Sequence, residues 1–250
     1  EVKADGFDLV DDFSDLFGMN AAGTDAKMRN TKESILEAQF TPGAGNWCTW
    51  MFGRDLVNWN NNFTWAKWVT PSRDLISTFK QEGDEVRFKE SVVYYDCGWS
   101  NYYPSDNYPF MYKCRSANSS IIKYRYADVL LLKAEALIMQ DTPDLEGAAD
   151  IIDEVRDRAK LGALSSSTRS NKDALLNALL KERRLELAFE GQRWFDLVRL
   201  DKVEEVMNAV HAKDSGRKAQ VYTYDKNSYR LPIPQSVIDA NDKIHQNPGY

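Results

Sequence analysis

NKDALLNALLKERRLELAFEGQRWFDLVRL, residues 171–200, is the stretch that decides the fold of this chain. Apolar and charged side chains recur in it at the i, i+3, i+4 and i+7 spacing of one helix face. The members of this face are Leu176, Leu179, Leu180, Arg183, Leu187 and Glu190. Ser170 is the expected N-cap, and Gly191 is the expected glycine at the end of the helix. The spacing therefore predicts one long helix, a break at Gly191, and a second short helix after it.

Charged side chains within an apolar face need partners, because a buried charge without a counter-charge is strongly destabilising. Arginines match the carboxylates of this stretch almost one for one, and catalytic acid/base pairs are rarely so neutralised. We therefore interpret these charges as a structural ion-pair network that locks the helix to its neighbours, and not as catalytic groups. The predicted members are Glu182, Arg183, Glu186, Glu190, Arg193, Asp196 and Arg199.

Length, charge and cysteine spacing bound the class of protein. The chain has 250 residues, which suits one large domain or two small ones. A net charge of -6, a pI near 5.1 and the lack of a Lys/Arg-rich block argue against nucleic-acid binding. No apolar run is long enough to span a bilayer. Cys48, Cys97 and Cys114 show no CxxC spacing, so a Cys97–Cys114 disulfide and free thiols both remain open.

The remaining pattern predicts further helices, a strand and loop-rich segments. Helices are expected over 126–137 and 145–159, and their small, Ala-rich contact face resembles a tetratricopeptide hairpin, although no sibling repeat is visible. Thr142-Pro143 is the expected cap and first residue of the second helix. The other expected elements are an amphipathic stretch at 7–17, a strand at 34–40, a helix from Pro71 to Phe79, a loop-rich segment at 91–120, a helical pattern from Ile121, a polar linker at 165–170, a helix at 203–210, an extended LPIP at 231–234 and a turn at 237–240.

An aromatic, loop-like segment precedes the helices. Residues 41–70 read TPGAGNWCTWMFGRDLVNWNNNFTWAKWVT, in which Gly, Pro and Asn interrupt any regular element. Its tryptophans either fill a core beneath a long loop or form platforms that stack on sugar rings, with asparagines hydrogen-bonding hydroxyl groups beside them. A long irregular loop in a compact domain is more often functional than not.

Four segments together resemble the C-terminal part of the SusD/RagB family of outer-membrane nutrient-binding lipoproteins. They are IIKYRYADVLLLKAEAL (121–137), AADIIDEVRDRAKL (148–161), ERRLELAFEGQRWFDLVRL (182–200) and YRLPIPQSVIDANDKIHQNPGY (229–250). The resemblance implies a mainly α fold of tetratricopeptide-like helical hairpins, with long irregular aromatic-rich loops and little β structure. It further implies one domain over 1–250, with a ligand-binding insert at 41–120 and a helical scaffold and tail at 121–250.

By the same resemblance, we expect a non-enzymatic protein that binds glycans at the cell surface and delivers them to a SusC-like TonB-dependent transporter. The expected location is the outer membrane, as a surface-exposed lipoprotein. The chain departs from the family in that it begins at Glu1 without a lipid-acceptor Cys and lacks most of the N-terminal helices. Membrane contact is therefore expected only through an anchor missing from this chain. No cofactor, metal or nucleic-acid partner is expected.

Ligand contacts vary within such a family, so candidate residues follow from the aromatic insert. The first candidates are Trp47, Trp50, Trp59, Asn60, Asn62, Trp65 and Trp68. The second candidates are Tyr102, Tyr103 and Tyr108.

Two other functions stay open. A tetratricopeptide-like scaffold would bind peptides on its helical face and would leave the tryptophans as core. A glycoside hydrolase would need two carboxylates about 5–10 Å apart beside the aromatic platform. The available aspartates are Asp55, Asp74, Asp84, Asp96 and Asp106. None lies in a recognisable motif, and the chain has two His, no GxSxG and no metal-ligand cluster.

Overall fold

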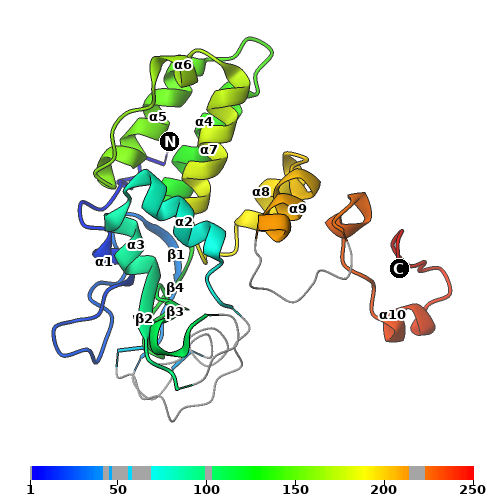
Figure 1. Ribbon diagram of the computed structural model, residues 1–250, viewed down its shortest axis with the longest axis horizontal. Coiled ribbons are helices and arrows are strands. Elements are labelled where there is room, and N and C mark those ends of the chain that lie inside the picture. Colours follow the sequence, from blue (N-terminus) through cyan, green and yellow to red (C-terminus); the bar gives the residue numbers. More distant parts are fainter. Residues whose placement is uncertain (1, 42–44, 47–55, 58–68, 99–102, 214–222) are drawn as a thin grey trace. The chain divides into compact units, whose positions relative to one another are not determined.

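The computed structural model describes residues 2–41, 45–46, 56–57, 69–98, 103–213 and 223–250 (Figure 1). Its Cα atoms group into two compact units, Glu1–Gly191 and Gln192–Tyr250. The expectation of one domain over 1–250 stays a prediction.

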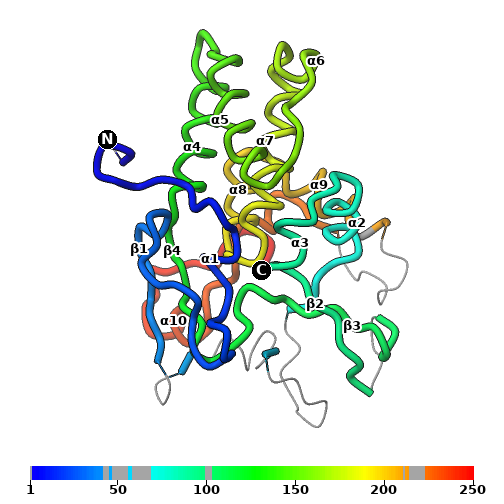
Figure 2. The backbone as a smooth tube through the Cα atoms, turned by 90° about the vertical axis from the view of Figure 1, so that its left-hand side faces the viewer, coloured from blue at the N-terminus to red at the C-terminus, as the bar shows by residue number. Residues whose placement is uncertain are grey.

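Three helices form the helical layer of the first unit. They are α4 (Tyr126–Ile138), α5 (Leu145–Arg158) and α7 (Lys172–Glu186), and Figures 1 and 2 show them side by side. Their shared core includes Leu131, Ala134, Ala149, Ile152 and Leu175, none of which reaches solvent. Small alanines on α4 and α5 let the two helices approach closely, so the predicted helical hairpin is confirmed.

The residues that cap these helices differ from the predicted ones, so the helices begin at other positions. Asn171, and not Ser170, caps α7, because its side chain accepts a hydrogen bond from the Ala174 backbone N–H. The predicted linker at 165–170 is wrong in part, since Ser165 caps a short helix α6 (Ser166–Arg169). Asp144 caps α5, so Pro143 lies before the helix and not at its first position.

The long central helix is shorter than predicted. It ends at Glu186, and the chain then turns with positive φ at Phe189 (66°) and Gly191 (84°). A second helix, α8 (Arg193–Arg199), follows in the other unit. Glu190 thus lies on a turn, from which its side chain still points into the interior.

Two small antiparallel sheets lie in the first unit. Strand β1 (Ser34–Ala38) pairs with β4 (Ile121–Arg125), so the helical pattern predicted from Ile121 is wrong for the first five residues. Strand β2 (Val92–Tyr95) pairs with β3 (Tyr108–Met111), within the segment predicted to be loops. The aromatic content of 91–120 thus serves a hairpin core as well as a surface, since Tyr108 and Phe110 are buried.

Helices α2 (Arg73–Glu82) and α3 (Glu85–Ser91) come directly before β2. Ser72 caps α2 through the Leu75 backbone N–H, so the helix begins after Pro71. Gly83 ends α2 in the left-handed conformation, and Asp84 then caps α3. Short elements complete this unit: α1 (Ser14–Phe17) and the 3₁₀ helix η2 (Ser105–Asn107).

The second unit contains α8, α9 (Val203–Lys213), the 3₁₀ helix η3 (Lys226–Tyr229) and α10 (Gln235–Ala240). Leu231–Pro234 is without helix or strand, in agreement with the extended LPIP that was predicted. Among the described residues of this unit, only Asp196, Leu197 and Val203 are buried. Hydrogen bonds, more than a core, therefore hold its last residues in place.

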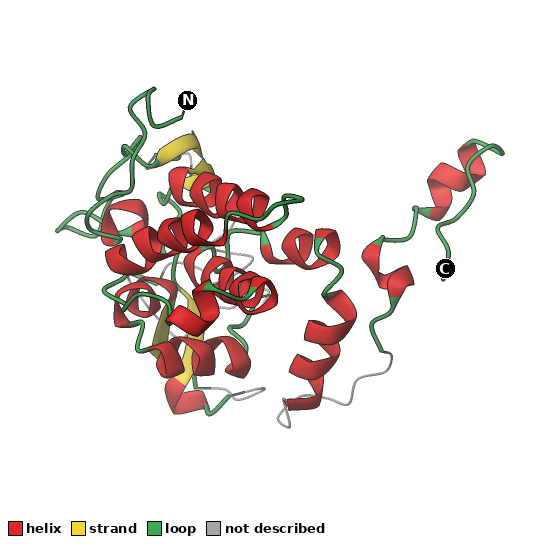
Figure 3. Cartoon of the chain, turned by 90° about the horizontal axis from the view of Figure 1, so that it is seen from above, coloured by secondary structure: helices red, strands yellow, loops and turns green. Residues whose placement is uncertain are grey.

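The chain is mainly helical with little β structure, as Figure 3 shows by colour, and the predicted fold class is confirmed. In the described part of the chain, every helix is too short or too polar to cross a membrane.

Candidate ligand-binding site

Most of the predicted ligand contacts lie outside the residues that the structure describes. These are Trp47, Trp50, Trp59, Asn60, Asn62, Trp65, Trp68 and Tyr102. The described candidates are Tyr103 and Tyr108, and they differ in position. Tyr103 is half-buried and lines a cavity, whereas Tyr108 is 2% exposed and belongs to the hairpin core.

The cavity that Tyr103 lines has a volume of about 450 Å³. One side consists of α2, which contributes Arg73, Ser77 and Gln81. The other side consists of Tyr94 in β2 and of the segment from Tyr103 to Asn107. We call this cavity the Tyr94–Tyr103 pocket. It combines aromatic rings with amide, hydroxyl and cationic groups, which is the composition expected of a small polar-ligand site.

Tyr103 is held firmly in this pocket. Its hydroxyl donates a hydrogen bond to the Pro71 carbonyl oxygen at 2.8 Å. The ring meets Tyr108 edge to face at a centroid distance of 5.7 Å, and the Arg73 guanidinium lies 4.6 Å from the ring centre. Burial raises the pKa of Tyr103 above its ordinary value, so the phenol stays protonated at neutral pH. Tyr108 thus supports Tyr103 from the core.

Of the nine described residues that line this pocket, Tyr103 alone was a sequence candidate, and the polar groups of Tyr94 and Asn107 were not predicted. Tyr94 contacts Phe88 edge to face, and its hydroxyl has no hydrogen-bond partner among the described residues. Asn107 is exposed, and its side-chain amide is likewise unpaired within the described ranges. Strand alternation could have found Tyr94, since Val93 and Tyr95 pack into the hairpin core and place Tyr94 on the opposite face.

A buried charge cluster lies where α3, α7 and β4 meet. Glu182 accepts hydrogen bonds from Arg87 at 2.5 Å and from Arg156 at 3.1 Å. Glu186 binds Arg87 at 3.0 Å, Arg125 at 2.5 Å, and Arg158. The cluster consists of the carboxylates Glu33, Asp84, Glu182, Glu186 and Glu190 and the cations Arg87, Lys113, Arg125, Arg156 and Arg158.

Matched charges set the pKa values in this cluster. Burial alone would raise the pKa of Glu186, but the charges of Arg158, Arg125 and Arg87 outweigh burial and hold that pKa well below 4.5. Arg125 and Lys113 likewise lower the pKa of Glu190 against the effect of burial. Burial lowers the pKa of Lys113 to about 8, although Glu190 accepts a hydrogen bond from its amine at 2.6 Å. Glu186 and Glu190 are therefore ionised, buried and paired with cations, which suits structural support and not acid/base chemistry.

The other predicted network members pair outside this cluster. Arg183 lies 2.9 Å from Asp128 of α4, and Asp196 lies 2.9 Å from Arg199 within α8. Arg193 is half-buried in the first turn of α8.

Of the aspartates considered for a glycoside hydrolase, those that the structure describes do not line the Tyr94–Tyr103 pocket. Asp55 lies outside the described residues. Asp74 binds Arg184 at 2.6 Å, and Asp84 is buried against Arg87. Asp96 and Asp106 are exposed residues that do not face the cavity. Among the residues described, this pocket therefore has no carboxylate pair.

The structure shows no disulfide between Cys97 and Cys114, which is one of the two alternatives that their spacing allows. Cys97 is buried and Cys114 is half-buried, while Cys48 lies outside the described residues.

Comparison with known proteins identifies the family of this chain. The sequence model of the SusD family matches residues 106–250, which is more than half of the chain. The chain belongs to the SusD family. Two curated relatives come from Formosa agariphila. SusD-like protein P38 is 41% identical over 139 residues, 53% of this chain and 25% of that protein. SusD-like protein P2 is 34% identical over 142 residues, 54% of this chain and 27% of that protein.

Solved structures of the SusD superfamily share the fold. A member from Bacteroides vulgatus superposes with a TM-score of 0.71 at 20% identity, over 98% of this chain and 55% of that one. A laminarin-binding SusD-like protein superposes with a TM-score of 0.64 at 24% identity, over 98% of this chain and 54% of that one. Surface glycan-binding protein A from Bacteroides thetaiotaomicron, in complex with laminarihexaose, superposes with a TM-score of 0.71 at 19% identity. The superposition covers 97% of this chain and 56% of that one. The chain thus spans about half the length of these structures and about a quarter of the curated relatives.

Proposed function

We propose that this chain is the glycan-binding part of a non-enzymatic cell-surface protein that delivers oligosaccharides or polysaccharides to a SusC-like TonB-dependent transporter. The observation that carries the proposal is the Tyr94–Tyr103 pocket, an aromatic and polar cavity in a chain of the SusD family. Two proteins of the same fold support the ligand class, one being described as laminarin-binding and the other solved with laminarihexaose.

The pocket would bind sugar through a fixed aromatic surface and a few hydrogen bonds. Tyr103 cannot rotate freely, because its hydroxyl is bound to Pro71 and its ring is packed on Tyr108. A ring fixed in advance loses little conformational entropy when a ligand stacks on it. The unpaired hydroxyl of Tyr94 and the amide of Asn107 would then exchange hydrogen bonds with sugar hydroxyls. Such open sites bind weakly, with Kd on the order of millimolar to micromolar.

The tryptophan-rich segment would extend this surface. Trp68 directly precedes Val69 and Thr70 in the chain, and the Thr70 hydroxyl lies 3.3 Å from the Tyr108 hydroxyl oxygen. We include Trp47, Trp50, Trp59, Asn60, Asn62, Trp65, Trp68 and Tyr102 in the proposal as further contacts with a longer glycan.

The absence of catalysis, the transporter partner and the outer-membrane location belong to the same proposal. Membership of the SusD family supports all three. The lack of a carboxylate pair in the described part of the pocket gives the hydrolase alternative no support.

Affinity electrophoresis of the whole chain tests the proposal. Gels containing laminarin, starch, xylan or pectin should include one polysaccharide that retards the protein, and Tyr94→Ala and Asn107→Ala should each reduce that retardation. The matched control is Tyr124→Ala, since Tyr124 is 56% exposed on β4 and lies outside the pocket. A triple variant with Trp47, Trp59 and Trp65 changed to Ala tests the extended surface. Equal retardation of Y94A, N107A and wild type, or hydrolysis of the retained glycan, would contradict the proposal.

A further inference from the structure

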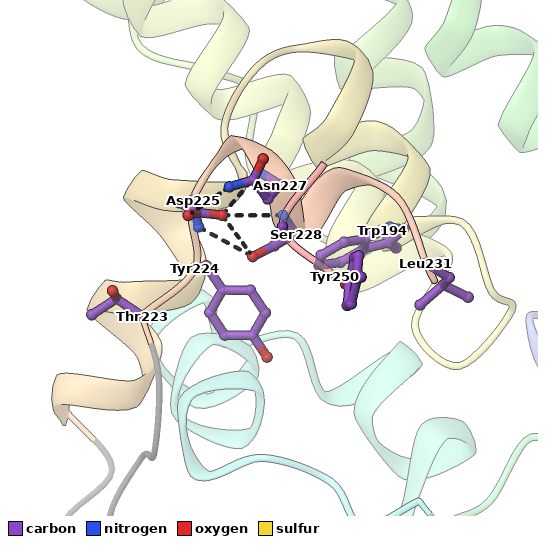
Figure 4. A pocket seen from close by; sticks show the side chains of 9 residues that line it. Trp194, Thr223, Tyr224, Asp225, Asn227, Ser228, Leu231 and Tyr250 are labelled. Carbon is purple, nitrogen blue, oxygen red and sulfur yellow. Dashed lines mark hydrogen bonds between the residues drawn. The ribbon is translucent and has the colours of Figure 1, made fainter. Parts of the chain in front are cut away.

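The second unit contains a cavity of its own, and the described residues that line it all belong to that unit (Figure 4). Its volume is about 680 Å³, within the range of roughly 300–1,000 Å³ that is typical of small-ligand sites. Three pieces of chain form its walls: Trp194 of α8, residues 223–231, and Gly249 with Tyr250. We call it the Trp194 pocket.

Its aromatic wall is fixed by packing and by hydrogen bonds. The rings of Trp194 and Tyr224 lie 6.2 Å apart between centroids, tilted by 56°. Asn208 of α9 binds the Tyr224 backbone on both sides, since its Nδ2 donates to the Tyr224 carbonyl oxygen and its Oδ1 accepts from the Tyr224 N–H, each at 2.9 Å. Tyr224 is therefore held in position beside Trp194 whether or not a ligand is present.

The polar wall is formed around η3. Asp225 accepts hydrogen bonds from the backbone N–H groups of Asn227 (2.9 Å) and Ser228 (3.2 Å), so its carboxylate is already engaged. Figure 4 shows this hydrogen-bonded group on one side of the pocket, with Trp194, Leu231 and Tyr250 on the other.

Several polar groups at this pocket remain unpaired within the described part of the chain. They are the indole N–H of Trp194, the hydroxyl of Thr223 and the side-chain carbonyl oxygen of Asn227. The indole N–H can donate a hydrogen bond, the amide carbonyl oxygen can accept one, and the hydroxyl can do both. A ligand that carries many hydroxyl groups would satisfy all three.

The C-terminal wall depends on a close approach of two backbones. Gly249 has φ +94°, and a Cβ atom on it would lie 2.6 Å from the Cβ of Asn227. The Tyr250 hydroxyl donates to the Arg230 carbonyl oxygen at 3.0 Å, and Asn247 donates to that of Leu231 at 2.7 Å. Residues 247–250 thus stay folded against the segment that forms the polar wall.

We propose that the Trp194 pocket binds one hexose unit of a neutral glycan, as a second site that is separate from the Tyr94–Tyr103 pocket. The rings of Trp194 and Tyr224 offer the amphipathic surface on which the apolar face of a sugar ring packs. Among the described residues that line the pocket, Asp225 has the single charged side chain, and none of them has a cationic one. Because an acidic sugar would face that carboxylate without a counter-charge, the site favours an uncharged sugar.

An apolar side chain of a protein partner would fit the pocket less well. Leu231 and the aromatic rings would accept it, but the indole N–H, the Thr223 hydroxyl and the Asn227 carbonyl oxygen would lose water without gaining a partner. Each polar group left in that state weakens binding substantially. The unpaired polar groups therefore select the sugar over the apolar peptide.

NMR of the indole N–H groups in the whole chain tests this proposal. The Trp194 resonance is identified as the one that disappears in Trp194→Phe. Laminarihexaose, maltohexaose and cellohexaose are added at millimolar concentrations, as is a short leucine-containing peptide. We expect the Trp194 resonance to move with at least one hexasaccharide and not with the peptide. Trp194→Ala should weaken the affinity measured at this pocket about tenfold, followed through backbone resonances near Asn227.

Two further variants separate this site from the first one and from misfolding. Tyr94→Ala removes a contact of the Tyr94–Tyr103 pocket and should leave the Trp194 shift unchanged, so the two proposals fail independently. Phe195→Ala is the matched control, because Phe195 lies on the same helix with 65% of its surface exposed and does not line the pocket. It should bind as wild type does. A Trp194 resonance that moves with no hexasaccharide, or that moves only with the peptide, would overturn the proposal.

Discussion

Arg87 of α3 and Glu182 of α7 form a fully buried ion pair, with Nη1 2.5 Å from Oε1 although the two residues are 95 positions apart in the sequence. The pair joins α3 to the central helix. Since α3 directly follows α2, it also fixes α2, which forms one side of the Tyr94–Tyr103 pocket. Arg87 therefore links the helical scaffold to the proposed ligand site.

Glu182→Ala should strongly destabilise the first unit. The change would strand the guanidinium of Arg87 without one of its counter-charges, and loss of one partner of a buried pair typically costs about 3–5 kcal/mol. Urea denaturation followed by circular dichroism measures the free energy of unfolding. The control is Glu205→Ala, which removes a 67% exposed carboxylate paired with Lys202 and should change the midpoint far less. Equal effects of the two substitutions would mean that the buried pair is not a stabilising contact.

Acid should unfold the protein through Glu186 and Glu190. Their pKa values are lowered in the folded state, so over the range below about 4.5 the unfolded chain binds protons that the folded chain does not. The stability from these groups is fully present above that pH and is lost as the pH falls through the folded-state pKa values. Unfolding free energies measured from pH 6 down to about pH 3 should fall more steeply for wild type than for Glu190→Gln. Equal dependence of the unfolding free energy on pH in wild type and Glu190→Gln would contradict a lowered pKa of Glu190.

Lys113 should make the free energy of unfolding depend on pH in the alkaline range. Its pKa is about 8 when folded against 10.5 when exposed, so between these values the unfolded chain holds a proton that the folded chain lacks. Stability should therefore rise as the pH increases from 8 towards 10.5, by at most about 1.4 kcal/mol per pH unit from this group. The difference in unfolding free energy between wild type and Lys113→Met, measured at several pH values, isolates the contribution. A difference that stays constant with pH would contradict it.

Sequence periodicity was sufficient to predict the helices, but it could not identify the distant residues that pair with their buried charges. The arginines that match the carboxylates of 171–200 predicted an ion-pair network that includes Glu182 and Glu186, because a buried charge is tolerated only when it is paired. The pattern could not identify Arg87 or Arg125, since nothing local indicates which distant arginine meets a given carboxylate. The same limit hid the pocket, because Tyr94 and Asn107 come together only through the pairing of β2 with β3.

Two local patterns were misleading for a clear reason. The segment 121–125 leads directly into the apolar helix that follows, and only its pairing with β1 shows that it is a strand. Short apolar runs do not distinguish a strand from a buried helix. The aromatic segment 91–120 is loop-rich by its sequence pattern, but part of it forms the β2–β3 hairpin with a core around Phe110. Composition indicated a ligand surface without indicating which rings face solvent.

The phase of α4 can be tested with two adjacent leucines. Leu131 is fully buried among α5 and α7, whereas Leu132 is 40% exposed. Leu131→Ala should lower the free energy of unfolding by about 2–5 kcal/mol, because it removes buried methyl groups and leaves a cavity. Leu132→Ala should lower it by about 1 kcal/mol or less, since much of that side chain already contacts water. Both substitutions replace the same residue type in the middle of one helix, so the difference in helix propensity cancels. Urea denaturation of the two variants therefore measures burial alone, and equal losses would show that α4 is rotated about its axis from the orientation described.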